Sequence, residues 1–249
     1  MDLKGRVALV AGGTGLLGTA IARALAGAGA DVAITYLERK DAARETCAVV
    51  EGLGRKALSV ALDQTKDEQI GPAVEAVKKH FGRIDILVNN AGWNVSIPFP
   101  DLEALDAAVW DRLFSTNLRG PYLICRAAAP HLRASGSGRI VNIASVAGLN
   151  PGGSSIAYAT SKAGLIHLSR CLAVALAPQV SVNCVAPGLM DGTRMTSRLR
   201  PEQVQGALQR AILKRAATVE DVAEQVLTFC KSDSVTGQTV NIDAGVFFH

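Results

Sequence analysis

The sequence lacks any segment that could cross a membrane and any long run of Lys and Arg with interleaved aromatic residues. Its apolar runs fall short of the roughly 18 consecutive apolar residues of a membrane span. The apolar run before Gly12 is also too short for the core of a signal peptide. The formal net charge of +4 is spread along the chain, so a nucleic-acid groove is not expected. We therefore expect a cytoplasmic protein whose partners are neither nucleic acids nor membranes.

Cysteine and histidine are also sparse. The five cysteines lie far apart without a CxxC pair, and the four histidines do not cluster. This spacing argues against a disulfide framework and against a zinc site, so we expect reduced, buried thiols and no metal ion. A Gly-x-Ser-x-Gly elbow is missing, as is a lysine directly after the first glycine loop. Hydrolase chemistry and P-loop phosphoryl transfer are thereby excluded.

Short apolar segments alternate along the chain with segments of helical character. Strands without a polar alternation are covered on both faces, and helical connections predict parallel pairing. The predicted strands are residues 7–10, 32–35, 57–62, 84–88, 140–143, 180–185 and 239–242, and the predicted helices are residues 16–28, 40–53, 67–81, 105–118, 121–134, 156–176 and 219–229. This order predicts an α/β protein with a Rossmann-type, doubly wound parallel sheet of about seven strands and helices on both faces. No linker divides residues 1–249, so one domain is expected.

Residues 189–215 interrupt the alternation. A long insertion of this kind is usually a lid or a partner surface, and the spacing of Ala207, Leu208, Ala211 and Ile212 predicts a short amphipathic helix within it. The segment is also basic, with Arg194, Arg198, Arg200, Arg210, Lys214 and Arg215. These residues could attract an acidic acyl carrier or a coenzyme A phosphate. The alternative is a solvated charged surface.

A glycine-rich segment, Gly12-Gly13-Thr14-Gly15-Leu16-Leu17-Gly18, joins the first predicted strand to the first predicted helix. At such a turn the backbone can approach a pyrophosphate, and free N–H groups and the helix dipole stabilise its charge. A glycine-rich turn without a ligand is the alternative. The cofactor contacts predicted in this loop are Gly12, Thr14, Gly15, Leu16 and Leu17.

A bound dinucleotide could supply a hydride to a carbonyl group. Carbonyl reduction would then also need a proton donor for the developing alkoxide. A phenol with its reference pKa of about 10 is a poor base at neutral pH, and a nearby cation must stabilise its phenolate. Tyr158 and Lys162 are four residues apart on one predicted helix and share a face. Ser145 ends a strand and can hold the substrate oxygen. Each of these residue types alone usually has a structural role. Their occurrence together is what indicates a catalytic site.

The motifs Asn89-Asn90-Ala91-Gly92, Tyr158-x-x-x-Lys162 and Pro187-Gly188, in this order after the glycine loop, resemble the short-chain dehydrogenase/reductase family over essentially the whole chain. The resemblance, nearest to 3-oxoacyl-carrier-protein reductases, implies an NAD(P)(H)-dependent oxidoreductase that interconverts a ketone and a secondary alcohol, with Tyr158 as acid/base. The implied catalytic residues are Asn117, Ser145, Tyr158 and Lys162, with Asn117 supporting a water relay to the lysine. The further implied cofactor contacts are Asp63, Gln64, Asn90, Ala91, Gly92, Tyr158, Lys162, Pro187 and Gly188.

One departure from the family lies in the glycine loop. Ala11 stands where the single-domain branch has Thr, and Leu16 occupies the middle glycine position. The resulting spacing of Gly12, Gly15 and Gly18 is closer to the family's extended branch.

The end of the second predicted strand bears on the choice of dinucleotide. NAD-specific relatives place an acidic residue there to accept hydrogen bonds from the ribose hydroxyls. Tyr36 occupies this position and removes both that acceptor and its repulsion of a 2′-phosphate. Arg39 and Lys40 could pair with the phosphate, or they could simply begin a solvated helix while Glu38 turns inward. We predict a preference for NADP(H), with NAD(H) as the alternative.

The substrate pocket is expected to be mostly apolar, which suits an acyl or alicyclic ketone. The residues expected to line it are Trp93, Val95, Ile97, Phe99, Leu149, Pro151, Leu189, Met190 and Met195. Residues 105–134 and 156–176 usually pack against symmetry mates in this family, so a homotetramer or homodimer is expected, with Phe247 and Phe248 buried at a second contact. Two other functions stay open: a non-catalytic dinucleotide-binding regulator and an NAD-dependent alcohol or sugar dehydrogenase.

Overall fold

A computed structural model describes residues 1–193, 196–199 and 201–248, and the side chain of Arg198 is not described. In this part of the chain, seven parallel strands form a sheet in the order β3-β2-β1-β4-β5-β6-β7. The strands are β1 (Val7–Ala11), β2 (Asp31–Tyr36), β3 (Ala57–Ala61), β4 (Ile86–Asn89), β5 (Gly138–Ile143), β6 (Val180–Pro187) and β7 (Thr239–Ile242). The predicted α/β fold is confirmed. The largest differences at strand ends are that β4 begins two residues later, β5 begins two residues earlier, and β6 extends to Pro187, where it pairs with Ile242 of β7.

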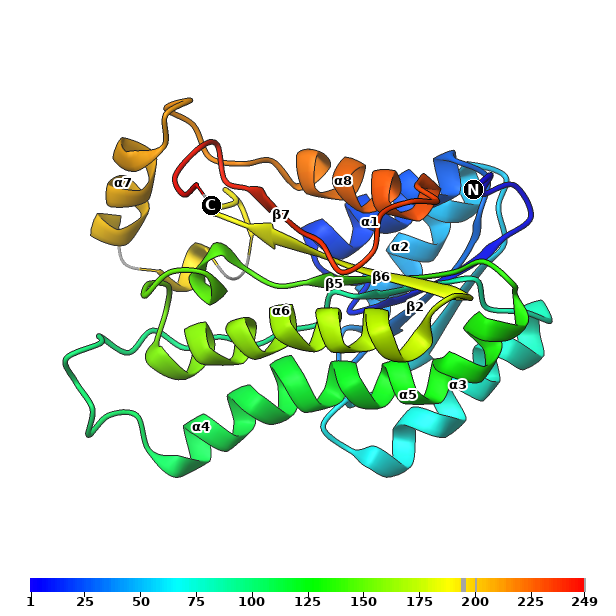
Figure 1. The fold of residues 1–249 in the computed structure, drawn as a ribbon, viewed down its shortest axis with the longest axis horizontal. Coiled ribbons are helices and arrows are strands. Elements are labelled where there is room, and N and C mark those ends of the chain that lie inside the picture. The colour runs from blue at the N-terminus through cyan, green and yellow to red at the C-terminus, as the bar shows by residue number, and fades with distance from the viewer. Residues whose placement is uncertain (194–195, 200, 249) are drawn as a thin grey trace.

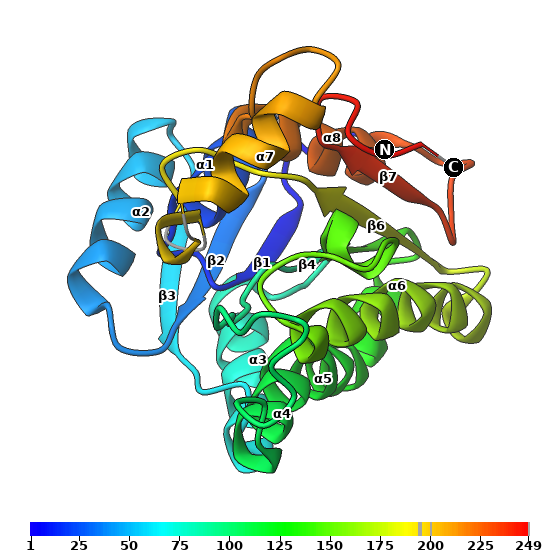
Figure 2. The same cartoon turned by 90° about the vertical axis from the view of Figure 1, so that its left-hand side faces the viewer.

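Helices cover both faces of the sheet (Figures 1 and 2). The helices are α1 (Leu16–Gly27), α2 (Lys40–Gly52), α3 (Asp67–Phe81), α4 (Ala107–Phe114), α5 (Gly120–Ala134), α6 (Ile156–Leu176), α7 (Pro201–Arg210) and α8 (Val219–Lys231). Helices α1, α2 and α8 pack on one face, and α3, α5 and α6 pack on the other. Helix α7 lies within residues 189–215, where a short helix was predicted, and includes Ala207 and Leu208 but ends before Ala211 and Ile212. Arg194, Met195 and Arg200 lie outside the described residues.

Strand β1 shows why the predicted strands lack a polar alternation. All five of its residues are buried, and successive side chains of a strand point to opposite faces. Ala8 and Val10 belong to the apolar core beneath α1 and α8, whereas Val7, Leu9 and Ala11 belong to the core beneath α3 and α5. Both faces therefore require apolar side chains.

The strand order reverses beside β1. The chain runs from β1 to β2 and β3 on one side, then crosses to β4 and the remaining strands on the other side. Leu9 of β1 accordingly pairs with Ala33 of β2 and with Leu87 of β4. In open α/β sheets, ligands bind in the crevice at the carboxyl ends of the strands next to such a reversal. The glycine loop, which follows β1, lies at this point.

The two helices predicted at residues 105–118 and 121–134 are joined without a break. Helix α4 begins after Asp106, whose carboxylate accepts a hydrogen bond of 2.8 Å from the Val109 N–H. It leads into a π-helical turn, Ser115–Arg119, and then directly into α5. Such turns are frequent at functional sites. The prediction of separate helices was wrong here, because the wider turn depends on long-range contacts of Asn117 and Gln64 that no local pattern indicates.

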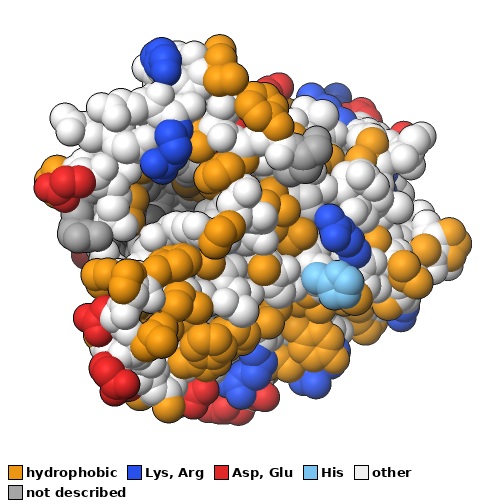
Figure 3. Space-filling model, turned by 60° about the vertical axis from the view of Figure 1, so that its left-hand side comes forward, with side chains coloured by type: hydrophobic (Ala, Val, Ile, Leu, Met, Phe, Trp, Pro, Cys, Tyr) orange, Lys and Arg blue, Asp and Glu red, His pale blue; other side chains and the backbone are white. Residues whose placement is uncertain are grey.

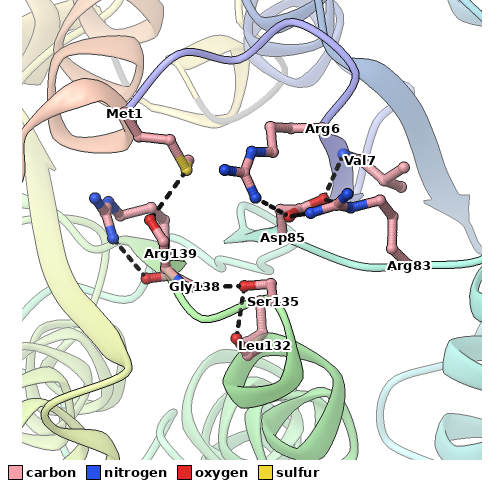
Figure 4. Close-up of polar contacts among 10 residues, drawn as sticks. Met1, Arg6, Val7, Arg83, Asp85, Leu132, Ser135, Gly138 and Arg139 are labelled. Carbon is pink, nitrogen blue, oxygen red and sulfur yellow. Dashed lines mark hydrogen bonds and ion pairs between the residues drawn. The ribbon is translucent and has the colours of Figure 1, made fainter.

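A buried carboxylate ties the opposite, amino-terminal edge of the sheet together (Figure 4). Asp85 is fully buried and accepts hydrogen bonds from Arg6 at 2.9 Å, from Arg83 at 2.6 and 2.8 Å, and from the Val7 N–H at 2.9 Å. The hydrogen bond with Asp85 raises the pKa of Arg83. The residues that precede β1 and β4 are thus held by one charge cluster, far along the strands from the glycine loop.

We expect Asp85→Asn to lower the free energy of unfolding by about 2–4 kcal/mol, because an amide cannot replace a buried carboxylate shared by two guanidinium groups. Urea denaturation measures the change. The matched control is Asp41→Asn, since Asp41 forms an ion pair with Arg44 in which the side chains are 89% and 67% exposed. Exposed pairs of this kind contribute less than about 1 kcal/mol. Equal effects of the two substitutions would show that the Asp85 cluster does not stabilise the sheet edge.

Candidate active site

A cleft of about 1450 Å³ runs along the carboxyl ends of the strands and is bordered by the glycine loop, α6 and α7. It is lined by every residue predicted to contact the cofactor: Gly12, Thr14, Gly15, Leu16, Leu17, Tyr36, Arg39, Asp63, Gln64, Asn90, Ala91, Gly92, Tyr158, Lys162, Pro187 and Gly188. Ser145 also lines it. These residues come from seven separate segments of the chain, and the fold brings them to one edge of the sheet.

Glycines in the loop after β1 permit close approach of backbones. Gly12 has a positive φ of 77°, and a Cβ there would lie 2.6 Å from the Ala91 Cα. A Cβ on Gly18 would lie 2.3 Å from the Gly12 carbonyl oxygen. Gly15 differs from both, because a Cβ added to it would meet no atom within 4 Å. Gly12 and Gly18 are therefore packing requirements, whereas Gly15 borders open space in the cleft.

The amino end of α1 is arranged to receive an anion. Its N-cap residue is Gly15, which provides no side-chain hydrogen bond, and its first turn carries no acidic residue. The first N–H groups of a helix have no partner within the helix and favour negative charge. Leu16 and Leu17, the first two residues of α1, line the cleft at this point. The residues present therefore fit the pyrophosphate of a dinucleotide.

Arg39 lies across the glycine loop. Its Nη1 donates a hydrogen bond of 2.9 Å to the Thr14 carbonyl, and the side chain remains exposed. Tyr36 is the last residue of β2 and is half-buried at the wall of the cleft. A guanidinium at this position neighbours both the glycine loop and the end of β2. No carboxylate occupies the position of Tyr36, as the sequence already indicated.

Two of the predicted cofactor residues also hold the cleft wall together. The Asn90 side chain donates a hydrogen bond of 2.7 Å to the Gly12 carbonyl. The Gln64 side chain is buried and donates to the Thr116 carbonyl at 2.6 Å and to the Ala91 carbonyl at 3.3 Å. Asp63 binds its own loop by accepting from the Thr65 N–H and hydroxyl. The contacts of Asn90 and Gln64 reach backbone groups 27 to 78 residues away and were not apparent from the sequence.

Tyr158 is buried, with 8% of its surface exposed. Helix α6 begins just before it, because the Ser155 hydroxyl accepts a hydrogen bond of 3.2 Å from the Tyr158 N–H. Burial raises the pKa of Tyr158, and a side-chain hydrogen bond with Ser145 partly opposes that rise. The phenol is therefore protonated at neutral pH and can serve as a proton donor.

Lys162 lies one turn further along α6 and is 3% exposed. Its Nζ donates a hydrogen bond of 2.8 Å to the Ile143 carbonyl and lies 5.9 Å from the centroid of the Tyr158 ring. Burial lowers the pKa of Lys162 to about 8, although the nearby Cys184 opposes the shift. A buried ammonium next to a phenol stabilises the phenolate that proton donation would leave.

Asn117 is fully buried in the π-helical turn and does not line the cleft. Its side-chain oxygen accepts a hydrogen bond of 2.8 Å from the Trp93 N–H, and its amide donates to the Trp93 carbonyl at 2.9 Å. The amide also donates to the Ser161 hydroxyl at 3.2 Å. Asn117 thus anchors the segment after β4, and its predicted link to Lys162 through water stays a prediction.

Comparison with known proteins places the chain in a family. A family model described as enoyl-(acyl carrier protein) reductase matches residues 13–247. The putative ketoacyl reductase 2 of the granaticin polyketide synthase of Streptomyces violaceoruber is 37% identical, over 96% of this chain and 95% of its own. The 3-oxoacyl-[acyl-carrier-protein] reductase FabG of Aquifex aeolicus is 36% identical, over 99% of both chains.

Solved structures give the same result. A putative short-chain dehydrogenase/reductase from Burkholderia xenovorans is 34% identical, with a TM-score of 0.90 over 97% of both chains. This chain belongs to the short-chain dehydrogenase/reductase family. NADPH-dependent 3-quinuclidinone reductase from Rhodotorula rubra, 31% identical with a TM-score of 0.90, matches 98% of this chain and 92% of its own. As a member of the family, the chain is an oxidoreductase that interconverts carbonyl and alcohol groups with a nicotinamide dinucleotide.

The structure shows which residues of this short-chain dehydrogenase/reductase line the cleft at the end where the substrate is expected to bind. Of the expected apolar residues, Trp93, Pro151, Leu189 and Met190 line the cleft, whereas Val95, Ile97, Phe99 and Leu149 do not. Arg112, Asn94, Asn150, Ser154 and Phe247 line it as well and were not expected. Polar side chains therefore join the apolar ones that the sequence predicted. These positions carry no local motif, and only the tertiary fold brings them to the cleft.

Two further observations concern the described part of the chain. It contains no group of three or more His, Cys, Asp or Glu side chains placed to hold a metal ion. Its helices also include none with the length and apolar character needed to span a membrane.

Proposed function

We propose that the chain acts as one domain that reduces a ketone to a secondary alcohol with NADPH, with Ser145, Tyr158 and Lys162 as its catalytic residues. The observation that carries the proposal is the buried Tyr158, which is hydrogen-bonded to Ser145 and has the Lys162 ammonium beneath its ring, in the same cleft as the glycine loop. The experiment is to follow NADPH loss with a panel of acyl, alicyclic, steroid and sugar ketones. Loss with at least one ketone supports the proposal.

The site residues divide the reaction among themselves. The glycine loop, Tyr36, Arg39, Asn90 and the other predicted contacts would hold the dinucleotide, which would supply a hydride for the carbonyl carbon. The Ser145 hydroxyl orients the carbonyl oxygen, and the Tyr158 phenol donates the proton that the developing alkoxide requires. Lys162 stabilises the resulting phenolate by its charge. In the reverse direction the same phenolate accepts the alcohol proton.

Arg39 supports the preference for NADP(H). A charge-assisted hydrogen bond contributes about 1.5–3 kcal/mol, and the guanidinium borders the cleft beside Tyr36 with its side chain exposed. We expect Arg39→Ala to raise the KM for NADPH by about 10- to 100-fold and to change the KM for NADH by less than about threefold. Steady-state kinetics with both cofactors measure this. A higher kcat/KM of the unaltered enzyme with NADH than with NADPH would contradict the preference and make Glu38 the residue to test.

The substrate class that fits best is a 3-oxoacyl thioester or an alicyclic ketone. The relatives include ketoacyl reductases, a cis-4-hydroxycyclohexanecarboxylate dehydrogenase and a 3-quinuclidinone reductase. Residues 189–215 form the proposed lid, and α7 within it lines the cleft through Glu202, Gln203, Gly206, Ala207 and Arg210. Basic residues there suit an acyl carrier as a partner. A cytoplasmic location agrees with these substrates.

A surface formed by α4, the π-helical turn, α5 and α6 supports a homodimer or homotetramer. A groove of about 680 Å³ on it is lined by Asp111, Phe114, Ser115, Leu118, Arg119, Tyr122, Gly164, His167, Leu168 and Cys171. Figure 3 shows hydrophobic side chains gathered over the lower half of the molecule, where Figure 1 places these helices. Contrary to the expectation of buried thiols, Cys171 is exposed there, and Cys47 on α2 is half-buried. Phe248, also expected to be buried, is 77% exposed near the C-terminus, which suits a second contact in a tetramer.

We expect light scattering at micromolar concentration to give a dimer or tetramer, since apolar surfaces of this kind are rarely left exposed to solvent. Cys171→Arg, which places a charge in the groove, should shift the protein towards the monomer. Cys171→Ser is the matched control and should keep the assembly. A monomer for the unaltered protein would contradict the proposed assembly.

A further inference from the structure

We propose that Arg112, stacked on Trp93 at the substrate end of the cleft, binds an anionic group of the substrate, so that the preferred ketone carries a carboxylate or a phosphate. The inference rests on the proposed function, because it names the substrate class of the same site. Both side chains line the cleft that contains Ser145 and Tyr158. Neither position was expected to bind charge from the sequence.

Trp93 provides a fixed platform next to the proton donor. Its backbone N–H and carbonyl are both bound by the side chain of the fully buried Asn117, at 2.8 and 2.9 Å. Its ring packs against an apolar cluster of Leu113, Ala147, Ala157 and Tyr158. The Trp93 backbone is thus fixed by Asn117 of the π-helical turn, and its indole ring is fixed by the cluster that contains Leu113 of α4 and Tyr158.

Arg112 is oriented by this platform. Its guanidinium carbon lies 4.1 Å from the centroid of the Trp93 ring, a distance typical of a cation–π contact. This contact engages the charge of the guanidinium and leaves its N–H groups available for hydrogen bonds. Within the described part of the chain, no hydrogen bond or ion pair engages these N–H groups, whereas Arg6, Arg83 and Arg139 each have a carboxylate partner.

The surroundings of Arg112 favour an anion. The cleft-lining residues between 90 and 154 include no Asp or Glu, and the polar ones among them, such as Asn94, Asn150 and Ser154, are neutral. The carboxylates that line the cleft are those of Glu38, Glu45 and Asp63, near β2 and β3, and of Glu202 and Glu220, on α7 and α8. Lys162 adds a second positive charge on this side. The charged side chains that residues 90–162 contribute to the cleft are thus Arg112 and Lys162, and both favour an oxyanion.

The planar fork of a guanidinium matches the two oxygens of a carboxylate or of a phosphate. Two sources could present such an oxyanion while the carbonyl is at Tyr158. One is a carboxylate on the ketone itself, and the other is a phosphate on the carrier arm of an acyl thioester. Arg112 would recognise an oxyanion in either case. Pairs of anionic and neutral substrates can show whether the oxyanion is the carboxylate or the phosphate.

Binding can be tested without turnover, because the chain has only two tryptophans. In a Trp110→Phe background, Trp93 is the sole reporter of indole fluorescence. We expect cyclohexanecarboxylate to change this fluorescence at about 10- to 100-fold lower concentration than cyclohexanecarboxamide, and Arg112→Gln to remove the difference. Arg44→Gln, at an exposed arginine on α2 that does not line the cleft, is the matched control and should keep it.

The second test compares turnover of matched ketones at saturating NADPH. One pair is 4-oxocyclohexanecarboxylate and its methyl ester, and the other is acetoacetyl-coenzyme A and acetoacetyl-N-acetylcysteamine. In at least one pair, the kcat/KM of the anionic member should exceed that of the neutral member by about 10- to 100-fold, and Arg112→Gln should lower this ratio to near one. The first pair identifies a carboxylate and the second a phosphate.

The inference is overturned if the enzyme reduces ketones and neither pair shows a preference that depends on Arg112, or if no ketone is reduced and the fluorescence titration shows no such preference. The first of these results differs from failure of the proposed function. Reduction of the neutral ketones with no advantage for the anionic ones overturns only the role of Arg112. Absence of NADPH loss with every ketone overturns the proposed function, while the fluorescence titration still decides whether Arg112 binds oxyanions.

Discussion

Replacing Tyr158 with Phe should lower turnover by about 10²- to 10⁴-fold, the usual contribution of general acid–base catalysis. The substitution removes only the phenol hydroxyl. The aromatic ring keeps its place in the apolar cluster with Leu113, Ala147 and Ala157, so the fold and the cofactor site should persist. NADPH oxidation in the steady state measures turnover, and a fluorescence titration with NADPH should give a Kd within about twofold of the unaltered protein.

Tyr122 provides a matched control for this substitution. It lies on α5, is 42% exposed and does not line the cleft. Tyr122→Phe should leave turnover within about twofold of the unaltered enzyme. If Tyr158→Phe retained more than about a tenth of the original turnover with chemistry as the slow step, the proton would have to come from another group, and the assignment would be wrong.

Lys162→Met should lower turnover by about 10²- to 10³-fold, the usual effect of removing one preorganised electrostatic group. Methionine fills most of the space of the aliphatic stem but leaves the Ile143 carbonyl without its hydrogen bond and the phenolate without its cation. Lys79→Met on α3, at an exposed lysine, is the matched control and should have no effect on turnover.

The pH dependence provides a second measurement of the same residue. Burial lowers the pKa of Lys162 to about 8, so its ammonium is present below that pH and is lost above it. Tyr158 has a raised pKa and stays protonated across this range. The kcat/KM for NADPH, which reports groups of the free enzyme, should therefore be level below about pH 8 and fall above it. Lys162→Met should show a low rate without this fall. An unchanged profile in the variant would contradict the role of the lysine.

Much of the fold could be predicted because burial on both faces leaves a local signal. Strands such as β1 are short and apolar and lead into a helix, and glycine marks the end of β1. Tyr158 and Lys162 could be paired for a similar reason, because a spacing of four residues on a helix fixes their shared face. The cleft follows from the reversal of strand order beside β1.

The remaining features depend on contacts between distant residues. The continuous path from α4 into α5 reflects the Asn117 side chain, which binds Trp93, 24 residues earlier in the chain. Gln64 and Asn90 likewise hold backbone groups of other segments, and no periodicity indicates such partners. The contact of Arg112 with the Trp93 ring is likewise one between residues that are distant in the sequence. Local patterns thus predicted the reacting groups, whereas the shape and charge of the substrate end required the tertiary structure.

Product analysis of NADPH-dependent turnover tests the central claim most directly. The protein is incubated with NADPH and each ketone of the panel, and consumed NADPH is compared with the alcohol formed. The site geometry predicts that one equivalent of secondary alcohol appears for each NADPH consumed with at least one ketone, and that Tyr158→Phe nearly abolishes both. Tight binding of NADPH without any alcohol formed from the whole panel would contradict the claim and favour a regulatory dinucleotide-binding protein.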